Sequence, residues 1–85
     1  MERCIGYKQA RQLMQEGRKA MVIPQFRGAH RIYILDEENL PRDRVRADSW
    51  DKLRQECVLI EKTHHGRRGQ HTNYIWSLKE AHDHG

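Results

Sequence analysis

Apolar residues near the N-terminus recur with the spacing of an amphipathic helix. They fall within about 120° of one another on a helical wheel, which is the pattern of a helix that buries one face. They are Tyr7, Ala10, Leu13 and Met14. Gly17 is suited to end this helix, because glycine readily adopts the left-handed conformation found after helix C-termini. The pattern predicts a helix over about residues 6–16.

Two short segments, 21–26 and 31–35, come next and are rich in β-branched and aromatic residues. Gly28 lies between them, so the pair predicts a β-hairpin. Pro24 has no amide hydrogen to give to a neighbouring strand, so we expect its strand to be an edge strand or to carry a bulge. An edge there would also offer a surface for a homodimer.

The middle of the chain predicts a second helix over about residues 49–57. Trp50, Leu53 and Cys57 share one face when this segment is drawn on a helical wheel. Asp48 precedes them and is expected to cap the helix by accepting a hydrogen bond from the amide of Trp50 or Asp51.

An apolar strand is expected to follow this helix directly, over residues 58–62, and residues 72–78 are expected to pair back on it. Gly66 and Gly69 bracket the tip of this second hairpin. The predicted order of elements is therefore α-β-β-α-β-β, with a frayed tail from residue 79 to the C-terminus.

The composition supports one small α+β domain over residues 1–85. Hydrophobic residues make up 36% of the chain and charged residues 33%, and the apolar ones lie in patterned segments. The longest apolar stretches hold about four residues, far short of the roughly 20 that span a bilayer, so neither a membrane segment nor a signal peptide is expected. We expect a cytoplasmic protein in which Cys4 and Cys57 are reduced.

A formal net charge of +4 and a pI near 9.4 permit a polyanionic partner. The densest basic cluster comprises Arg42, Arg44 and Arg46. In an extended segment these side chains would point to one side and clamp a phosphate strand. In a helical turn they would instead splay apart and pair with nearby acids, and the sequence leaves both conformations open.

The segment 64–71 carries the strongest functional signal, because nothing in it is suited to a core. His65, Arg67 and Arg68 are its main charged or titratable residues. We expect them to contact a partner, and the alternative is a mobile loop that carries surface charge. The chain holds six histidines, which would make such binding pH-sensitive because imidazole titrates near about 6.5.

The polar face of the second predicted helix is a further candidate for binding. Ser49, Lys52 and Gln55 lie roughly opposite Trp50 on the wheel. Gln pairs bidentately with adenine, and Ser and Lys bind bases or phosphates. The alternative is an ordinary solvated helix face, and three acids in the same segment would repel phosphate.

The histidines also raise the question of a metal site. Candidate ligands are Cys57, His64, His65 and His71, or His82 and His84 in the tail. The set lacks the paired cysteine spacing of structural zinc sites. The chain also lacks a phosphate-binding glycine motif and a nucleophile motif. We therefore expect a protein that is not an enzyme and that holds neither a metal nor a cofactor.

Residues 42–78 resemble the second half of a winged helix. The shared pattern is a short helix, an immediate apolar strand, a glycine-bracketed basic tip and an aromatic return strand. The chain departs from the family in having only residues 40–47 available for a preceding helix, and in its larger early hairpin. The resemblance implies a winged-helix-like fold with two β-hairpins.

It also implies a small non-enzymatic protein that binds double-stranded DNA, such as a transcriptional regulator of bacterial or phage origin. A homodimer would add specificity by reading two half-sites. The alternative is a small protein-interaction module or inhibitor that docks on a host or phage protein that handles nucleic acids. Convergence of the arginines at 42–46 and 67–68 on one face would favour DNA.

Overall fold

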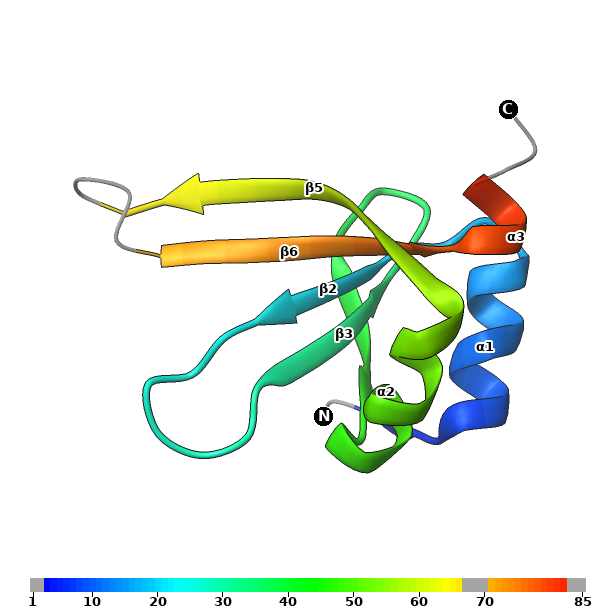
Figure 1. Ribbon diagram of the computed structural model, residues 1–85, viewed down its shortest axis with the longest axis horizontal. Coiled ribbons are helices and arrows are strands. Elements are labelled where there is room, and N and C mark those ends of the chain that lie inside the picture. The colour runs from blue at the N-terminus through cyan, green and yellow to red at the C-terminus, as the bar shows by residue number, and fades with distance from the viewer. Residues whose placement is uncertain (1–2, 67–70, 83–85) are drawn as a thin grey trace.

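The computed structural model describes residues 3–66 and 71–82, and six strands in these residues form one sheet (Figure 1). The strands are β1 (Arg3–Ile5), β2 (Ala20–Ile23), β3 (Arg31–Leu35), β4 (Pro41–Val45), β5 (Cys57–His65) and β6 (His71–Leu78). The helices are α1 (Tyr7–Gln15), α2 (Ala47–Leu53), the 3-10 turn η1 (Arg54–Glu56) and α3 (Lys79–His82). The expected α+β class is confirmed.

The strands lie in the order β1-β4-β3-β2-β6-β5, and all neighbours are antiparallel except β1 and β4. Register places Val22 beside Ile32, Ile32 beside Val45, and Val45 beside Ile5, so these side chains share one face. This face packs against α1 and α2 in a single core cluster. In Figure 1 both helices lie toward the end of the sheet that is farther from the tip of the β5–β6 hairpin.

The first helix and its stop signal are confirmed. Gly6 and Glu16 flank α1, and Gly17 has a φ of 99°, the left-handed conformation that the sequence predicted there. Ala10 and Met14 are fully buried. The buried face of α1 is therefore the apolar stripe of the sequence.

The predicted order of elements is incomplete, because β1, β4 and α3 were not expected. β1 has only three residues, and four of the five residues of β4 are Pro, Arg or Asp, so neither segment shows an alternating apolar pattern. Their extended conformation depends on pairing with each other and, for β4, with β3. The segment 79–82, expected to fray, forms the short helix α3.

The second helix is shorter than predicted and is capped differently. Its α-helical part ends at Leu53, and Cys57 is the first residue of β5 rather than the end of the helix. Arg46 occupies the N-cap position without a side-chain hydrogen bond, so the prediction that Asp48 caps the helix is wrong. Asp48 lies in the first turn, where its carboxylate accepts a hydrogen bond from the amide of Ser49 at 2.9 Å.

The prediction that Pro24 lies in an edge strand or at a bulge is also wrong. β2 lies between β3 and β6 and ends at Ile23, one residue before the proline. The missing amide hydrogen of Pro24 ends the strand instead of marking an edge. This topology removes β2 as a dimer edge. Within the described residues, the edges of the sheet are β1 and β5.

Trp50 and Leu53 are buried as the helical wheel predicted, with 5% and 0% of their surface exposed. Cys57 is buried as well and donates its thiol hydrogen to the carbonyl of Leu53 at 3.3 Å. The described part of the chain contains no helix of the length and hydropathy that crossing a membrane requires.

Candidate nucleic-acid interface

The β5–β6 hairpin extends past the rest of the sheet. β6 pairs with β5 from His71 to Leu78, but it pairs with β2 only from Tyr74 to Trp76. Residues 71–73 and their partners on β5 therefore form a two-stranded ribbon without a third strand, and Figure 1 shows this ribbon projecting from the sheet. Both strands are longer than the sequence predicted, because the polar residues at this end pair through their backbones.

The ribbon presents histidines on both of its faces. The Nδ1 atom of His64 lies 2.9 Å from the hydroxyl of Thr72, and Nε2 of His65 lies 3.2 Å from the side-chain oxygen of Asn73. The rings of His65 and His71 stack with their centroids 5.5 Å apart. His65 is exposed, as a residue that contacts a partner must be. Arg67 and Arg68 lie outside the described residues.

A second projection, the loop of residues 24–30 between β2 and β3, leaves the sheet at the same end (Figure 1). Phe26 in this loop is fully exposed. A cleft of about 620 Å³, which we call the tip cleft, lies between the loop and the hairpin and is lined by both. Phe26, His65 and His71 are among its lining residues. The two projections therefore frame one concave surface.

A further hollow, which we call the Trp groove, lies between α2 and the hairpin and has a volume of about 310 Å³. Its aromatic lining is Trp50, Tyr74 and Trp76. Arg54 and Lys62 also line it, and the ammonium of Lys62 lies 5.9 Å from the centre of the Tyr74 ring. The groove thus combines aromatic and cationic groups.

Sequence reasoning missed Arg54 and Lys62 as candidates. Arg54 is next to the Trp50–Leu53 stripe on the helical wheel, so it had to lie at the border of the buried face. Lys62 is two residues from His64 on a strand, so it had to share a face with it. The face of the helix or strand on which each residue lies could have been predicted from the sequence. Only the packing of α2 beside the hairpin brings the two residues to one groove.

The arginines of residues 42–46 lie on and next to β4. Of the two alternatives that the sequence left open, the structure has the extended one for Arg42 and Arg44, whereas Arg46 precedes α2. Arg44 is half-buried and is the cross-strand partner of Tyr33. Two strands separate β4 from β6 and three separate it from β5, which places the arginines of β4 about 14 Å across the sheet from β6 and about 19 Å from β5.

Ser49, Lys52 and Gln55 do not share the side of α2 that lines the Trp groove. The ammonium of Lys52 lies 5.4 Å from the centre of the Tyr7 ring of α1, and the carbonyl of Gln55 accepts a hydrogen bond from Lys79 at 3.4 Å. Ser49 is half-buried. Asp51 and Arg54 line the Trp groove instead.

Glu56 of η1 is the centre of a small polar network that includes residues of α1. Its carboxylate accepts hydrogen bonds from the hydroxyl of Tyr7 and from Nε of Arg11, the latter at 2.9 Å, and Arg11 also contacts Glu80 at 3.3 Å. The Tyr7 hydrogen bond and then the Arg11 contacts hold the pKa of Glu56 below its usual range. The same hydrogen bond to Glu56, followed by desolvation, raises the pKa of Tyr7. These contacts show that Glu56 connects η1 to α1, and that Arg11 extends the network from α1 to Glu80 of α3.

The candidate metal ligands are not brought together among the residues that the structure describes, which contain no group of three metal-binding side chains. Cys57 is buried at the start of β5, whereas His64, His65 and His71 are exposed near the tip of the hairpin. Burial raises the pKa of the Cys57 thiol to about 11, so it is protonated near neutral pH. His84 lies outside the described residues.

No protein-family model, curated protein or solved structure matches this chain. We therefore infer its candidate function from the geometry of its own surfaces.

Proposed function

We propose that the protein binds double-stranded DNA and that the β5–β6 hairpin is its main contact. The observation that carries the proposal is the extension of this hairpin beyond β2, which exposes a ribbon with His64 and His65 along it and the exposed Lys62 at its base. A ribbon of this kind inserts into a groove or follows the phosphates beside it, where cationic side chains are favoured. The net charge of +4 supports an anionic partner.

In the winged-helix-like form of this proposal, the hairpin is the wing and α2 is the helix that precedes it. Arg67 and Arg68 would add cations at the tip. The geometry supports the hairpin more than the polar face of α2, because the ammonium of Lys52 lies over Tyr7 of α1 and neither Lys52 nor Gln55 lines the Trp groove beside the hairpin. Arg42, Arg44 and Arg46 would serve only a ligand long enough to cross the sheet.

We propose DNA binding in transcriptional regulation as the role of such a module. A second candidate is docking on a protein, and the position of β5 favours it. β5 is an edge strand of nine residues, so a partner strand could add to its outer side through backbone hydrogen bonds. The fully exposed Phe26 would also suit a protein partner.

The experiment that separates the two candidates is a fluorescence anisotropy titration of a labelled duplex of about 25 base pairs, at about 50 and 200 mM salt. Binding that weakens steeply as salt rises supports the DNA proposal, since released counterions produce that dependence. A duplex that stays unbound at the lower salt concentration contradicts it and leaves docking on a protein as the better candidate.

A further inference from the structure

We propose that the Trp groove holds one unpaired base of a nucleic acid whose backbone lies along the β5–β6 hairpin. This inference rests on the proposed function and deepens it, because it names an unpaired nucleotide as part of the ligand. The groove has a volume of about 310 Å³, which is at the lower end of the range of small-ligand pockets, roughly 300–1,000 Å³.

The aromatic side chains of the groove belong to two elements. Trp50 of α2 and Trp76 of β6 meet edge to face, with ring centroids 5.7 Å apart and planes at 76°. Trp50 is only 5% exposed and so supports the groove from beneath, while Tyr74 and Trp76 are half-buried. Rings that are fixed by a core and still partly exposed are suited to stack on a base, because every base has a π face.

The face of Tyr74 already receives a cation. Lys62 is its cross-strand partner, and the ammonium lies 5.9 Å from the ring centre. Such a contact is worth only about 0.5–1 kcal/mol at an exposed site. A base can therefore take the place of the lysine against the ring, and the flexible lysine side chain can turn to the phosphate of the same nucleotide.

The charges at the groove match a nucleotide better than an apolar peptide. Among the described residues, the cations Arg54 and Lys62 line it with one acid, Asp51, and His30 lies beside them. The cations can hold the phosphodiester, while the carboxylate can accept a hydrogen bond from the amino group of a base. Val22 and Leu59 of the sheet complete an apolar lining beneath them.

The groove is placed to receive a base from nucleic acid bound at the hairpin. Lys62 is in the groove, and His64 lies two residues farther along β5, so one strand of the hairpin leads from the groove toward the tip. At about 3.4 Å per residue, these two residues span about 7 Å along the strand. This length is close to the distance between neighbouring phosphates of one nucleic-acid strand. A backbone that follows β5 would therefore bring one nucleotide to the Trp groove.

The test compares three labelled duplexes of identical core sequence: one blunt, one with a short unpaired overhang, and one with an overhang of the same length made of abasic nucleotides. The two overhangs carry the same charge and differ only in their bases. We expect the overhang with bases to bind about tenfold more tightly than the blunt duplex, the scale of one stacked base. The abasic overhang should lose most of this gain.

Intrinsic tryptophan fluorescence gives a second readout in the same titration. A base that stacks on Trp76 should quench its emission, and Trp76→Phe should remove this quenching while keeping an aromatic ring. Tyr74→Leu should reduce the preference for the overhang with bases about tenfold. Melting temperatures of both variants check that the fold is retained.

Equal affinity for the two overhangs, or unchanged tryptophan emission on saturation with the overhang that carries bases, would overturn the inference. The blunt duplex tests the proposed function separately. If it binds and the bases of the overhang add nothing, duplex binding stands and the groove inference fails. If only the overhang with bases binds, the groove inference stands and the duplex proposal fails.

Discussion

Trp50 on α2 packs edge-on against Trp76 on β6, with ring centroids 5.7 Å apart. This contact joins α2 to the β5–β6 hairpin, which follows α2 in the chain. Trp76 lies on β6, the return strand of that hairpin. One of the two side chains is buried and the other remains partly exposed, so the same contact belongs to the core and to a surface groove. The stability of the fold and the shape of the candidate site are therefore linked.

Trp50→Ala should lower the free energy of unfolding by about 3–5 kcal/mol, because it removes a large buried side chain and leaves a cavity beneath the hairpin. Chemical denaturation measures this change. Phe26→Ala is the matched control, since Phe26 is fully exposed, and it should change stability by less than about 0.5 kcal/mol. Similar effects of the two substitutions would contradict the packing described for α2.

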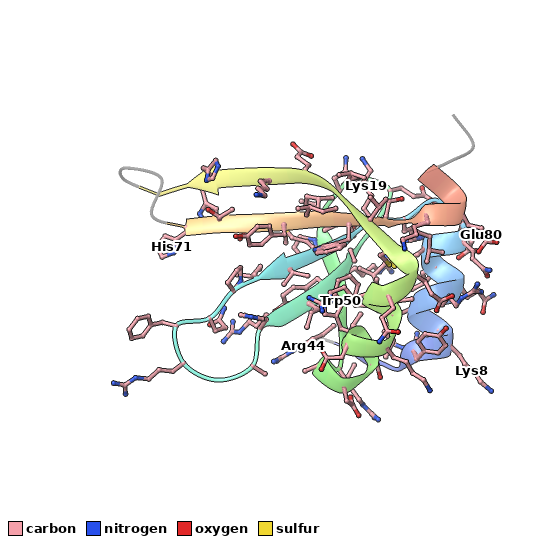
Figure 2. All side chains as sticks on the ribbon, viewed as in Figure 1. Lys8, Lys19, Arg44, Trp50, His71 and Glu80 are labelled. Atoms are coloured by element: carbon pink, nitrogen blue, oxygen red, sulfur yellow. The ribbon has the colours of Figure 1, made fainter. Side chains whose placement is uncertain are left out.

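Lys62→Ala should weaken DNA binding and reduce the slope of log affinity against log salt by about one. Lys8→Ala removes the same charge from an exposed position on α1, which Figure 2 shows at the opposite end of the molecule from His71. We expect Lys8→Ala to leave the salt slope nearly unchanged. Anisotropy titrations at several salt concentrations give both slopes, and equal losses would show that only the net charge matters.

The pH dependence of stability should reflect Glu56. Its pKa is lower in the folded protein, so its contribution is complete above the unfolded pKa of about 4.3 and is lost as pH falls through the folded value. Glu56→Gln should therefore melt at a lower temperature than the unchanged protein at neutral pH, and the difference should shrink below about pH 4. A difference in melting temperature that is constant from neutral to acidic pH would refute this role.

The two cysteines should differ sharply in reactivity. Cys4 is exposed on β1, whereas Cys57 is buried and burial raises its thiol pKa to about 11. An alkylating reagent at neutral pH should modify Cys4 first, and Cys57 only after denaturant is added, as intact mass measurement would show. Rapid double modification of the native protein would mean that the Cys57 end of β5 opens readily.

Gly66→Ala should destabilise the tip of the hairpin by about 1–2 kcal/mol, because Gly66 has a φ of 88° and its backbone is in a left-handed conformation. An added Cβ would also lie 3.0 Å from Cδ2 of His71. Gly6→Ala is a control without this strain, since a Cβ there meets no atom within 4 Å. Hydrogen exchange of the hairpin amides should increase in the first variant and not in the second.

Residue patterns predicted part of the candidate interface. The hairpin with exposed His65 was predicted because an apolar strand, glycines and an aromatic strand follow one another directly in the sequence. The neighbours of the polar side of α2 could not be predicted, because a helical wheel gives the angle between residues but not the element that each one meets. The structure shows these neighbours: the ammonium of Lys52 lies over the ring of Tyr7, and Arg54 lines the Trp groove.

The sequence by itself determined the elements whose apolar residues repeat with a regular period: α1, the buried face of α2, and the strands that hold the aromatic residues. These follow from local spacing, because a helix or strand that buries one face must place its apolar residues there. Tertiary structure alone decided the strand state of β1 and β4, the central place of β2 and the separation of the arginines on β4 from the hairpin. Those features depend on which strands exchange backbone hydrogen bonds across long stretches of chain. The choice of partner strand leaves no periodic pattern in the side chains of either strand.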